Sequence, residues 1–353
     1  MKPKLKFMVL GILALILLSA IPSITLASPE EDKPEIEERQ GAVFLITPKL
    51  KVRLSAGRPD ILFWISNSTY KQRTVPVYHI GFHYVAELYG DDLVVDSRDE
   101  IDGKIYNLIS DQITWNLEVE NFTDELRATI TSSQLANGAV ISFVYHLYLE
   151  DQTVTKELNN SRVAYFAEAL TQVKFDIIVS NWTFSPNATG LVFLVNVHEL
   201  AFRHRIRRGS GINDPEEHYR VNNTQIDPTN RTADPKRHGI EFLNTRGEIE
   251  AFFSWTPVAD VYDLNDNYIK SVNCTPTVAS YGFDVKTFKG RKFGVEYTNL
   301  LLAYPNYGDN LKLVHDPTIG VNPESVLVSS SIIGAIALPI VAFAVIAIFR
   351  RKK

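Results

Sequence analysis

The sequence predicts an all-β fold: an antiparallel β-sandwich ectodomain, either one large sandwich or two packed ones, followed by a single C-terminal transmembrane helix. Three observations predict it. Short β-branched and aromatic runs recur from Gly41 onward with turn residues between them, which is typical of an antiparallel sandwich. Residues 326–349 form an apolar run without a charged side chain. The first 27 residues have the form of a secretory signal peptide.

The N-terminus carries the features of an export signal. Three lysines up to Lys6 form a basic region, residues 7–21 form an apolar region, and small residues up to Ala27 form a cleavage site. The mature chain is therefore expected to begin at residue 28. Residues 28–40 are rich in Glu and contain two prolines, so we expect an acidic, solvated leader.

The ectodomain is expected over residues 41–319, in two blocks of strands around a polar insert at residues 209–238. In Val140–Leu149 the apolar residues fall on odd positions, which predicts one core-facing side. Residues 161–171 are the one exported stretch with helical character. The expected strands are Val43–Ile46, Leu50–Leu54, Ile61–Ser66, Thr74–Tyr89, Ile113–Val119, Leu126–Thr131, Val140–Leu149, Val173–Val179, Leu191–Val197, Gly239–Leu243, Glu248–Trp255, Pro276–Asp284, Lys292–Tyr297 and Leu300–Tyr304.

The C-terminus predicts a membrane anchor. Residues 320–325 form a short stalk, residues 326–349 the transmembrane helix, and residues 350–353 a basic cytoplasmic tail. At about 1.5 Å per residue this helix covers the roughly 30 Å hydrocarbon core of a bilayer. The four terminal cations are retained on the cytoplasmic side. We therefore expect a single-pass protein of the cell membrane, with its N-terminus outside the cell and its C-terminus in the cytoplasm.

Charge and cysteine usage narrow the class of protein. The exported segment holds all 41 Asp and Glu residues but only 29 of the 36 Lys and Arg residues, so its net charge is −12. This charge argues against nucleic acid as a partner. Cys274 is the one cysteine in the chain, so no internal disulfide forms.

Sequons for N-glycosylation are frequent. The composition would give about three by chance, and the exported segment contains eight. Export, abundant sequons and the lack of disulfides together indicate an archaeal surface glycoprotein. The acceptors are Asn67, Asn121, Asn159, Asn181, Asn187, Asn222, Asn230 and Asn273.

A basic stretch is the favoured binding region. Arg203, Arg205, Arg207 and Arg208, together with His204, follow one another within an acidic ectodomain. Such a run would hold an acidic surface protein, a glycan or another copy of the chain. The alternative is a solvated edge strand whose charges block pairing between sheets.

An acidic turn is the candidate calcium site. Asp96, Asp99, Glu100 and Asp102 supply the oxygen ligands that Ca²⁺ requires, although acidic turns are also commonly just solvated. Residues 263–267 begin like an EF-hand loop. Tyr268 then stands where that loop requires Gly, so the motif is rejected.

The strand around His79 and His83 is unusual. These two residues should share one face, with Tyr78, Ile80, Phe82 and Tyr84 on the other. Four residues along a strand separate them by about 13 Å, too far to bind one metal ion. Each could join a metal site only with ligands from a neighbouring strand.

Catalytic motifs are absent from the sequence, and no catalytic residue is assigned. His198 precedes Glu199 and His315 precedes Asp316, but adjacent residues on a strand point to opposite faces. Cys274 is expected as a buried, inert thiol. Trp182, within a sequon, is expected nearest the surface of the four tryptophans.

The favoured function is a membrane-anchored surface protein that binds or assembles, as an adhesin, a receptor-like protein or a coat component. Catalysis is disfavoured because the sequence offers no motif for it. The alternative from another class is an anchored extracellular glycan hydrolase, in which two carboxylates distant in sequence converge in space.

Overall fold

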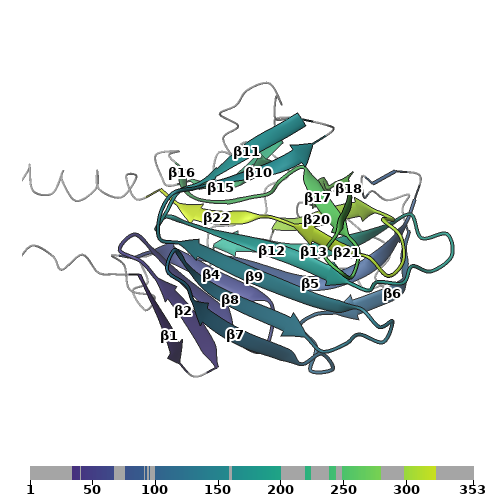
Figure 1. Ribbon diagram of the computed structural model, residues 1–353, viewed down its shortest axis with the longest axis horizontal. Coiled ribbons are helices and arrows are strands. Elements are labelled where there is room, and N and C mark those ends of the chain that lie inside the picture. The colour runs from purple at the N-terminus through teal and green to yellow at the C-terminus, as the bar shows by residue number, and fades with distance from the viewer. Residues whose placement is uncertain are drawn as a thin grey trace, which may run out of the picture. The chain divides into compact units, whose positions relative to one another are not determined.

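The structure is a computed structural model, and it describes residues 34–39, 41–66, 76–90, 92–93, 95, 100–158, 161–199, 219–223, 238–243, 249–279 and 298–322. The chain divides into two units, residues 1–33 and 34–353, and the first unit lies outside the described residues. The described part is all-β, with two antiparallel sheets, a separate two-stranded ribbon and no helix (Figure 1). The predicted fold class is confirmed in this respect.

The first sheet has nine strands. Along its main path they are β1 (Glu35–Arg39), β2 (Ala42–Ile46), β3 (Leu50–Ser55), β4 (Asp60–Ile65), β5 (Tyr78–Tyr89), β13 (Gly190–Glu199), β20 (Thr298–Pro305) and β19 (Thr275–Ala279). β6 (Glu100–Asn107) also pairs with β5. Since β13 runs along the whole of one edge of β5, β4 and β6 share the other edge.

The second sheet has eleven strands and is built around β12 (Gln172–Ser180). One edge of β12 pairs with β9 (Val140–Tyr148), which continues into β8 (Glu125–Ser132) and β7 (Trp115–Asn121). The other edge is divided between β21 (Lys312–His315) and β22 (Thr318–Val321). β21 leads to β17 (Val258–Tyr262) and β18 (Tyr268–Asn273), and β22 leads to β16 (Ile249–Ser254), β15 (His238–Leu243) and β14 (Tyr219–Asn223).

The ribbon consists of β10 (Gln152–Leu158) and β11 (Ser161–Ala167). It corrects the expectation of a helix over residues 161–171. Leu158 pairs with Ser161, so only two residues connect the strands. In so tight a hairpin the backbone N–H and C=O groups of each strand pair with those of the other. The Val, Tyr and Phe residues of β11 also favour a strand over a helix.

The two sheets enclose one continuous apolar core, as a β-sandwich does. The alternation expected for residues 140–149 is confirmed: Ile141, Phe143, Tyr145 and Leu147 are fully buried, while the residues between them are half-exposed. At the centre, the Phe82 ring of the first sheet lies 4.6 Å from the Phe143 ring of the second. Aromatic contacts of this kind join the sheets across the core.

A β-bulge changes which side chains of β5 enter the core. Along β13, Leu194 pairs with Tyr84 of β5 and the next residue, Val195, pairs with Phe82. His83 therefore has no partner in this register and is the extra residue of the bulge. Before the bulge, Tyr78, Ile80 and Phe82 face the core as expected. Tyr84 does not: it packs outside the core beside Ala86 and Leu88. The expectation for Tyr84 was wrong because one extra residue reverses the alternation.

Two described strands fall in segments expected to lack structure. β1 lies within residues 28–40 and pairs with β2, although most of its residues are exposed or half-exposed. β14 lies within the insert at residues 209–238 and pairs with β15. The last expected boundary, at residue 319, falls inside β22.

The described chain begins and ends at the same end of the sandwich. Glu35 pairs with Ile46, the hydroxyl of the next residue, Thr47, donates to the Leu170 carbonyl at 2.6 Å, and Val321 N–H donates to the Thr171 carbonyl at 3.0 Å. We call this the terminal end; the arrowhead of β22 points toward it, on the left of Figure 1. The opposite end, where Ser180 pairs with Lys312 and with Val140, is the far end.

The predicted signal peptide, the transmembrane helix at residues 326–349 and the basic tail lie outside the described residues. No helix among the residues that the structure describes is long and apolar enough to cross a membrane. The anchor remains a prediction from the sequence.

Candidate functional site

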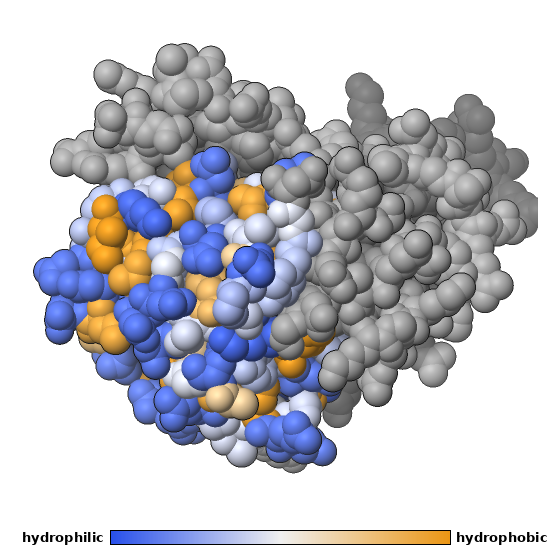
Figure 2. Space-filling model, turned by 90° about the vertical axis from the view of Figure 1, so that its right-hand side faces the viewer, coloured by the Kyte–Doolittle hydropathy of each residue, from blue (hydrophilic) through white to orange (hydrophobic). Residues whose placement is uncertain are grey.

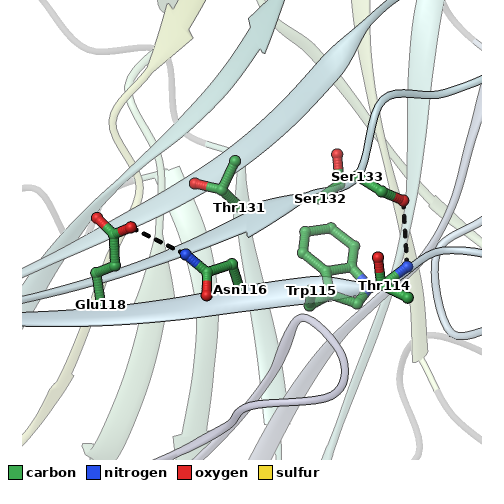
Figure 3. A pocket seen from close by; sticks show the side chains of 7 residues that line it. All are labelled: Thr114, Trp115, Asn116, Glu118, Thr131, Ser132 and Ser133. Atoms are coloured by element: carbon green, nitrogen blue, oxygen red, sulfur yellow. Dashed lines mark hydrogen bonds between the residues drawn. The ribbon is translucent and has the colours of Figure 1, made fainter.

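A polar hollow of about 440 Å³ lies over β7 and β8 near the far end (Figure 3). Its lining is short, polar side chains with one aromatic residue: Thr114, Trp115, Asn116, Glu118, Thr131, Ser132 and Ser133. It is open to solvent rather than enclosed, because β7 is an exposed strand with a half-buried and an exposed residue in alternation. These seven residues are the site hollow.

Strand register places the side chains of the hollow. Asn116 pairs with Thr131 and Trp115 with Ser132. Because successive residues alternate across a sheet, Asn116, Glu118 and Thr131 point outward. Trp115 turns its ring toward the buried Phe143 ring, 6.0 Å away, and its Nε1 donates to the Leu108 carbonyl at 3.0 Å. The indole therefore supports the floor of the hollow from the core side.

Hydrogen bonds order the rim of the hollow. Asn116 Nδ2 donates to Glu118 Oε1 at 2.9 Å, and Thr114 N–H donates to Ser133 Oγ at 3.2 Å (Figure 3). Thr131 Oγ1 lies 3.1 Å from Ser142 Oγ. The hydroxyl, amide and carboxylate groups here both donate and accept hydrogen bonds. The arrangement suits a ligand rich in hydroxyl or amide groups.

β7 also forms an edge of the second sheet. Among the described strands it pairs with β8 alone. An edge of this kind offers backbone groups to another extended chain unless charges discourage pairing. Glu118 and Glu120 are exposed on this strand, and their negative charges discourage such pairing.

The hairpin of β17 and β18 carries apolar side chains at the same end. Leu264, Tyr268 and Ile269 are 56%, 49% and 47% exposed. The turn is held by Asp263, which accepts hydrogen bonds from the backbone N–H of Asn265 and Asn267 at 2.8 and 2.9 Å. Figure 2 faces the far end and shows separate hydrophobic groups among hydrophilic ones. The exposed apolar residues of this hairpin are therefore presented on a fixed turn.

The predicted binding and calcium residues are largely outside the described part. The residues that lie outside the described part are Arg203, His204, Arg205, Arg207, Arg208, Asp96 and Asp99. Glu100 and Asp102 belong to β6, where they pair with Tyr89 and Glu87. The calcium site and the basic contact region stay predictions.

The described sequons lie at strand ends, in loops or on one edge strand. Asn121 ends β7 and Asn273 ends β18, and both are exposed, as is Asn187. Asn181 is half-buried, with Nδ2 donating to the Gly138 carbonyl at 3.2 Å. Asn222 lies on β14, and Asn67, Asn159 and Asn230 lie outside the described residues.

The carboxylates described near histidines are engaged by structural partners. His146 lies between Glu125 and Asp176, with nitrogen to oxygen distances of 3.1 and 3.2 Å. Burial alone would lower the pKa of His146, but hydrogen bonds and charge from Asp176 and Glu125 raise it above its ordinary value. The imidazole thus bridges the two carboxylates on the outer face of the second sheet.

The side chains of His315 and Asp316, which are adjacent in sequence, contact separate partners. His315 is fully buried, and its Nδ1 and Nε2 lie 2.8 Å from the Tyr304 hydroxyl and the Thr256 carbonyl. Asp316 faces Lys174, with Nζ 3.7 Å from Oδ2. Cys274 is a buried free thiol as expected, and burial raises its pKa, so the reactive thiolate is disfavoured.

The sequence did not indicate the hollow. Its lining comes from two segments on either side of a tight turn, and Ser, Thr and Asn residues are common in exposed strands. The one usable feature was the cluster of short polar residues at the start of β7 and the end of β8. No protein-family model matches the chain, and no curated protein matches it.

Proposed function

We propose that the chain is a membrane-anchored, N-glycosylated cell-surface protein, archaeal in origin, that binds an extracellular ligand through the far end of its sandwich. A hydroxyl-rich ligand such as a glycan is the class that the site hollow suits. Another surface protein or another copy of the chain is the alternative occupant.

The observation that carries the proposal is that the hollow and the two ends of the described chain lie at opposite ends of the sandwich. The last described residue, Asn322, precedes the predicted transmembrane helix by three residues. An anchor at residue 326 directs the terminal end toward the membrane, because three residues span at most about 10 Å. The far end, with the site hollow and the β17 and β18 hairpin, then faces away from the cell.

The chemistry of the hollow supports a polar ligand. Four hydroxyl side chains, the Asn116 amide and the Glu118 carboxylate line this solvent-open hollow. Short side chains lose little rotamer freedom on binding, and they hydrogen-bond to sugar hydroxyls or to a peptide backbone. Glu118 is the one carboxylate in the lining, whereas most glycosidases use a pair. The anchored glycan hydrolase is therefore the less supported alternative.

Binding of the full-length protein in detergent to an array of glycans tests the proposal. We expect Asn116→Ala and Glu118→Ala to weaken binding of a positive glycan by about tenfold, because each removes a hydrogen bond at the ligand, worth roughly 1–1.5 kcal/mol. Glu120→Ala is the matched control: it lies on the same strand and outward face, outside the lining, and should bind like the unchanged protein.

Three results would overturn the assignment. The first is a bound glycan whose affinity is unchanged by both hollow substitutions. The second is release of a cleaved glycan on incubation, which would restore the hydrolase. The third is the lack of any array binding together with a homogeneous self-assembled particle on sizing, which would replace glycan binding by a coat role.

A further inference from the structure

Three imidazoles and a carboxylate lie on the outer face of the first sheet, on the neighbouring strands β4, β5 and β13: those of His79, His83, His198 and Asp60. In the register, His79 of β5 pairs with Leu62 of β4 on one side and with His198 of β13 on the other, and Asp60 pairs with Gly81. His79 and His198 are half-buried, and Asp60 is 6% exposed. None of these residues belongs to the site hollow, which lies on the other sheet.

The spacing of the histidine pair is that of a hydrogen bond between the two rings, and it is also that of two ligands on one metal ion. His79 Nδ1 lies 3.3 Å from His198 Nδ1, with the rings 4.5 Å apart and inclined by 76°. A tetrahedral ion with metal to nitrogen bonds of about 2.0–2.1 Å places two nitrogen ligands about 3.3 Å apart. Antiparallel strands therefore supply the second ligand that a single strand does not.

Asp60 supports His79 from the opposite ring nitrogen. Asp60 Oδ1 lies 3.5 Å from His79 Nε2, and Asp60 Oδ2 lies 2.6 Å from Arg58 Nε. Asp60 Oδ1 has no hydrogen-bond partner among the described residues, so its buried negative charge favours a cation nearby. The other ring nitrogen of His79, Nδ1, faces His198.

Gly81 makes room for the cluster. A Cβ atom at this position would lie 2.8 Å from Asp60 Oδ1, 2.9 Å from His83 Nε2 and 3.1 Å from His79 Cε1. Real Cβ atoms essentially never show the first two distances, and the third is tighter than most, so a side chain here would require the carboxylate or an imidazole to shift. The absence of a side chain at residue 81 lets the charged and imidazole groups converge over the strand.

We propose that His79 and His198 bind a divalent first-row transition metal ion, with Asp60 as the positioning carboxylate. A tetrahedral pair of imidazole ligands fits Zn²⁺, and Cu²⁺, which binds imidazole more tightly but prefers a tetragonal geometry, serves as the spectroscopic probe. Within the described residues, no group of three or more His, Cys, Asp or Glu side chains is placed to hold a metal. Two protein ligands leave the remaining coordination positions to water or to a donor atom of a bound ligand.

Cu²⁺ titration of the full-length protein in detergent, read by calorimetry and electron paramagnetic resonance, tests the site. We expect one ion per chain and a spectrum that shows two imidazole nitrogens. His79→Asn and His198→Asn should each weaken binding at least tenfold. Asp60→Asn should weaken it about 10–100-fold while leaving both ligands in place.

His83→Asn is the matched control, because His83 lies on the same strand and the same sheet face as His79 but contacts Asn196, with Nδ2 and Nδ1 2.9 Å apart. It should bind Cu²⁺ like the unchanged protein. The site is overturned if the unchanged protein binds no stoichiometric Cu²⁺, if its spectrum shows fewer than two imidazole nitrogens, or if His198→Asn binds as tightly. The spectrum of the unchanged protein requires no variant to fold.

Discussion

Trp182 donates a hydrogen bond from its indole Nε1 to Oε1 of Glu87, at 3.2 Å, inside the sandwich core. Both side chains have no exposed surface. The expectation that Trp182 lies near the surface was therefore wrong. The sequon led us to place Trp182 near solvent with its neighbour Asn181. The Trp182 ring instead points into the core, where Glu87 accepts a hydrogen bond from its N–H.

Glu87 is a buried carboxylate with a full set of partners. Oε1 also accepts a hydrogen bond from Ser185 N–H at 2.9 Å, and Oε2 accepts one from the Tyr89 hydroxyl at 3.0 Å. Lys104 Nζ lies 3.7 Å from Oε1. Burial alone would raise the pKa of Glu87, but hydrogen bonds from Ser185, Tyr89 and Trp182 hold it below its ordinary value.

Replacement of Glu87 by Ala is expected to destabilise the fold by about 2–4 kcal/mol, because it leaves the buried Trp182 N–H and the Ser185 N–H without an acceptor. Chemical denaturation measures the loss. Glu118→Ala, on an exposed strand position, should change the free energy of unfolding by less than about 0.5 kcal/mol. Equal stabilities of the two variants would contradict the buried role of Glu87.

His146 predicts a pH dependence of stability. Its pKa is raised in the folded chain by Asp176 and Glu125. The contacts of protonated His146 with these carboxylates stabilise the fold fully below its pKa in the unfolded chain, about 6.5. This stabilisation is lost as the pH rises through the higher pKa of the folded chain. The melting temperature of the unchanged protein should exceed that of His146→Gln most at pH 5.5 to 6, with the difference shrinking toward pH 9. A difference that grows with pH would contradict this assignment.

Phe82 stands at the centre of the core, fully buried, and contacts the rings of Phe143, Phe175 and Phe193. Phe82→Ala should cost about 3–5 kcal/mol of unfolding free energy because it leaves a cavity between the sheets. Phe122→Ala is the control, since this ring is 38% exposed and Arg127 Cζ lies 4.4 Å from its centroid; it should cost less than about 1 kcal/mol. Urea denaturation of both variants gives the comparison.

The described sequons should differ in occupancy if the chain is N-glycosylated. Asn121, Asn187 and Asn273 are exposed and should carry glycan. Asn181 should be the least occupied, because its Nδ2, the atom that would be modified, donates to the Gly138 carbonyl in a half-buried position. Mass spectrometry of glycopeptides from the native protein measures the occupancies. Full occupancy at Asn181 with little at Asn187 would contradict this order.

The local pattern was enough for most of the strands and for the fold class. Val140 to Leu149 alternates so strictly that its core face follows from periodicity alone, and β12 and β13 were readable in the same way. Short strands with mixed composition were missed: β17, β18, β21 and β22 acquire their pairing from partners distant in the chain. Neither the site hollow nor the histidine pair was readable, because each is assembled from separate strands.

The sequence by itself determined that the described part of the chain is all-β, which face of β9 enters the core, and that His79 and His83 lie on the outer side. Only the tertiary structure decided that His198 lies beside His79, and that Glu87 rather than Ala86 enters the core. Glu87 enters the core because of the bulge at His83. The extra residue in β5 reverses the face on which every later side chain of that strand lies, and the bulge is seen only once β5 is paired with β13.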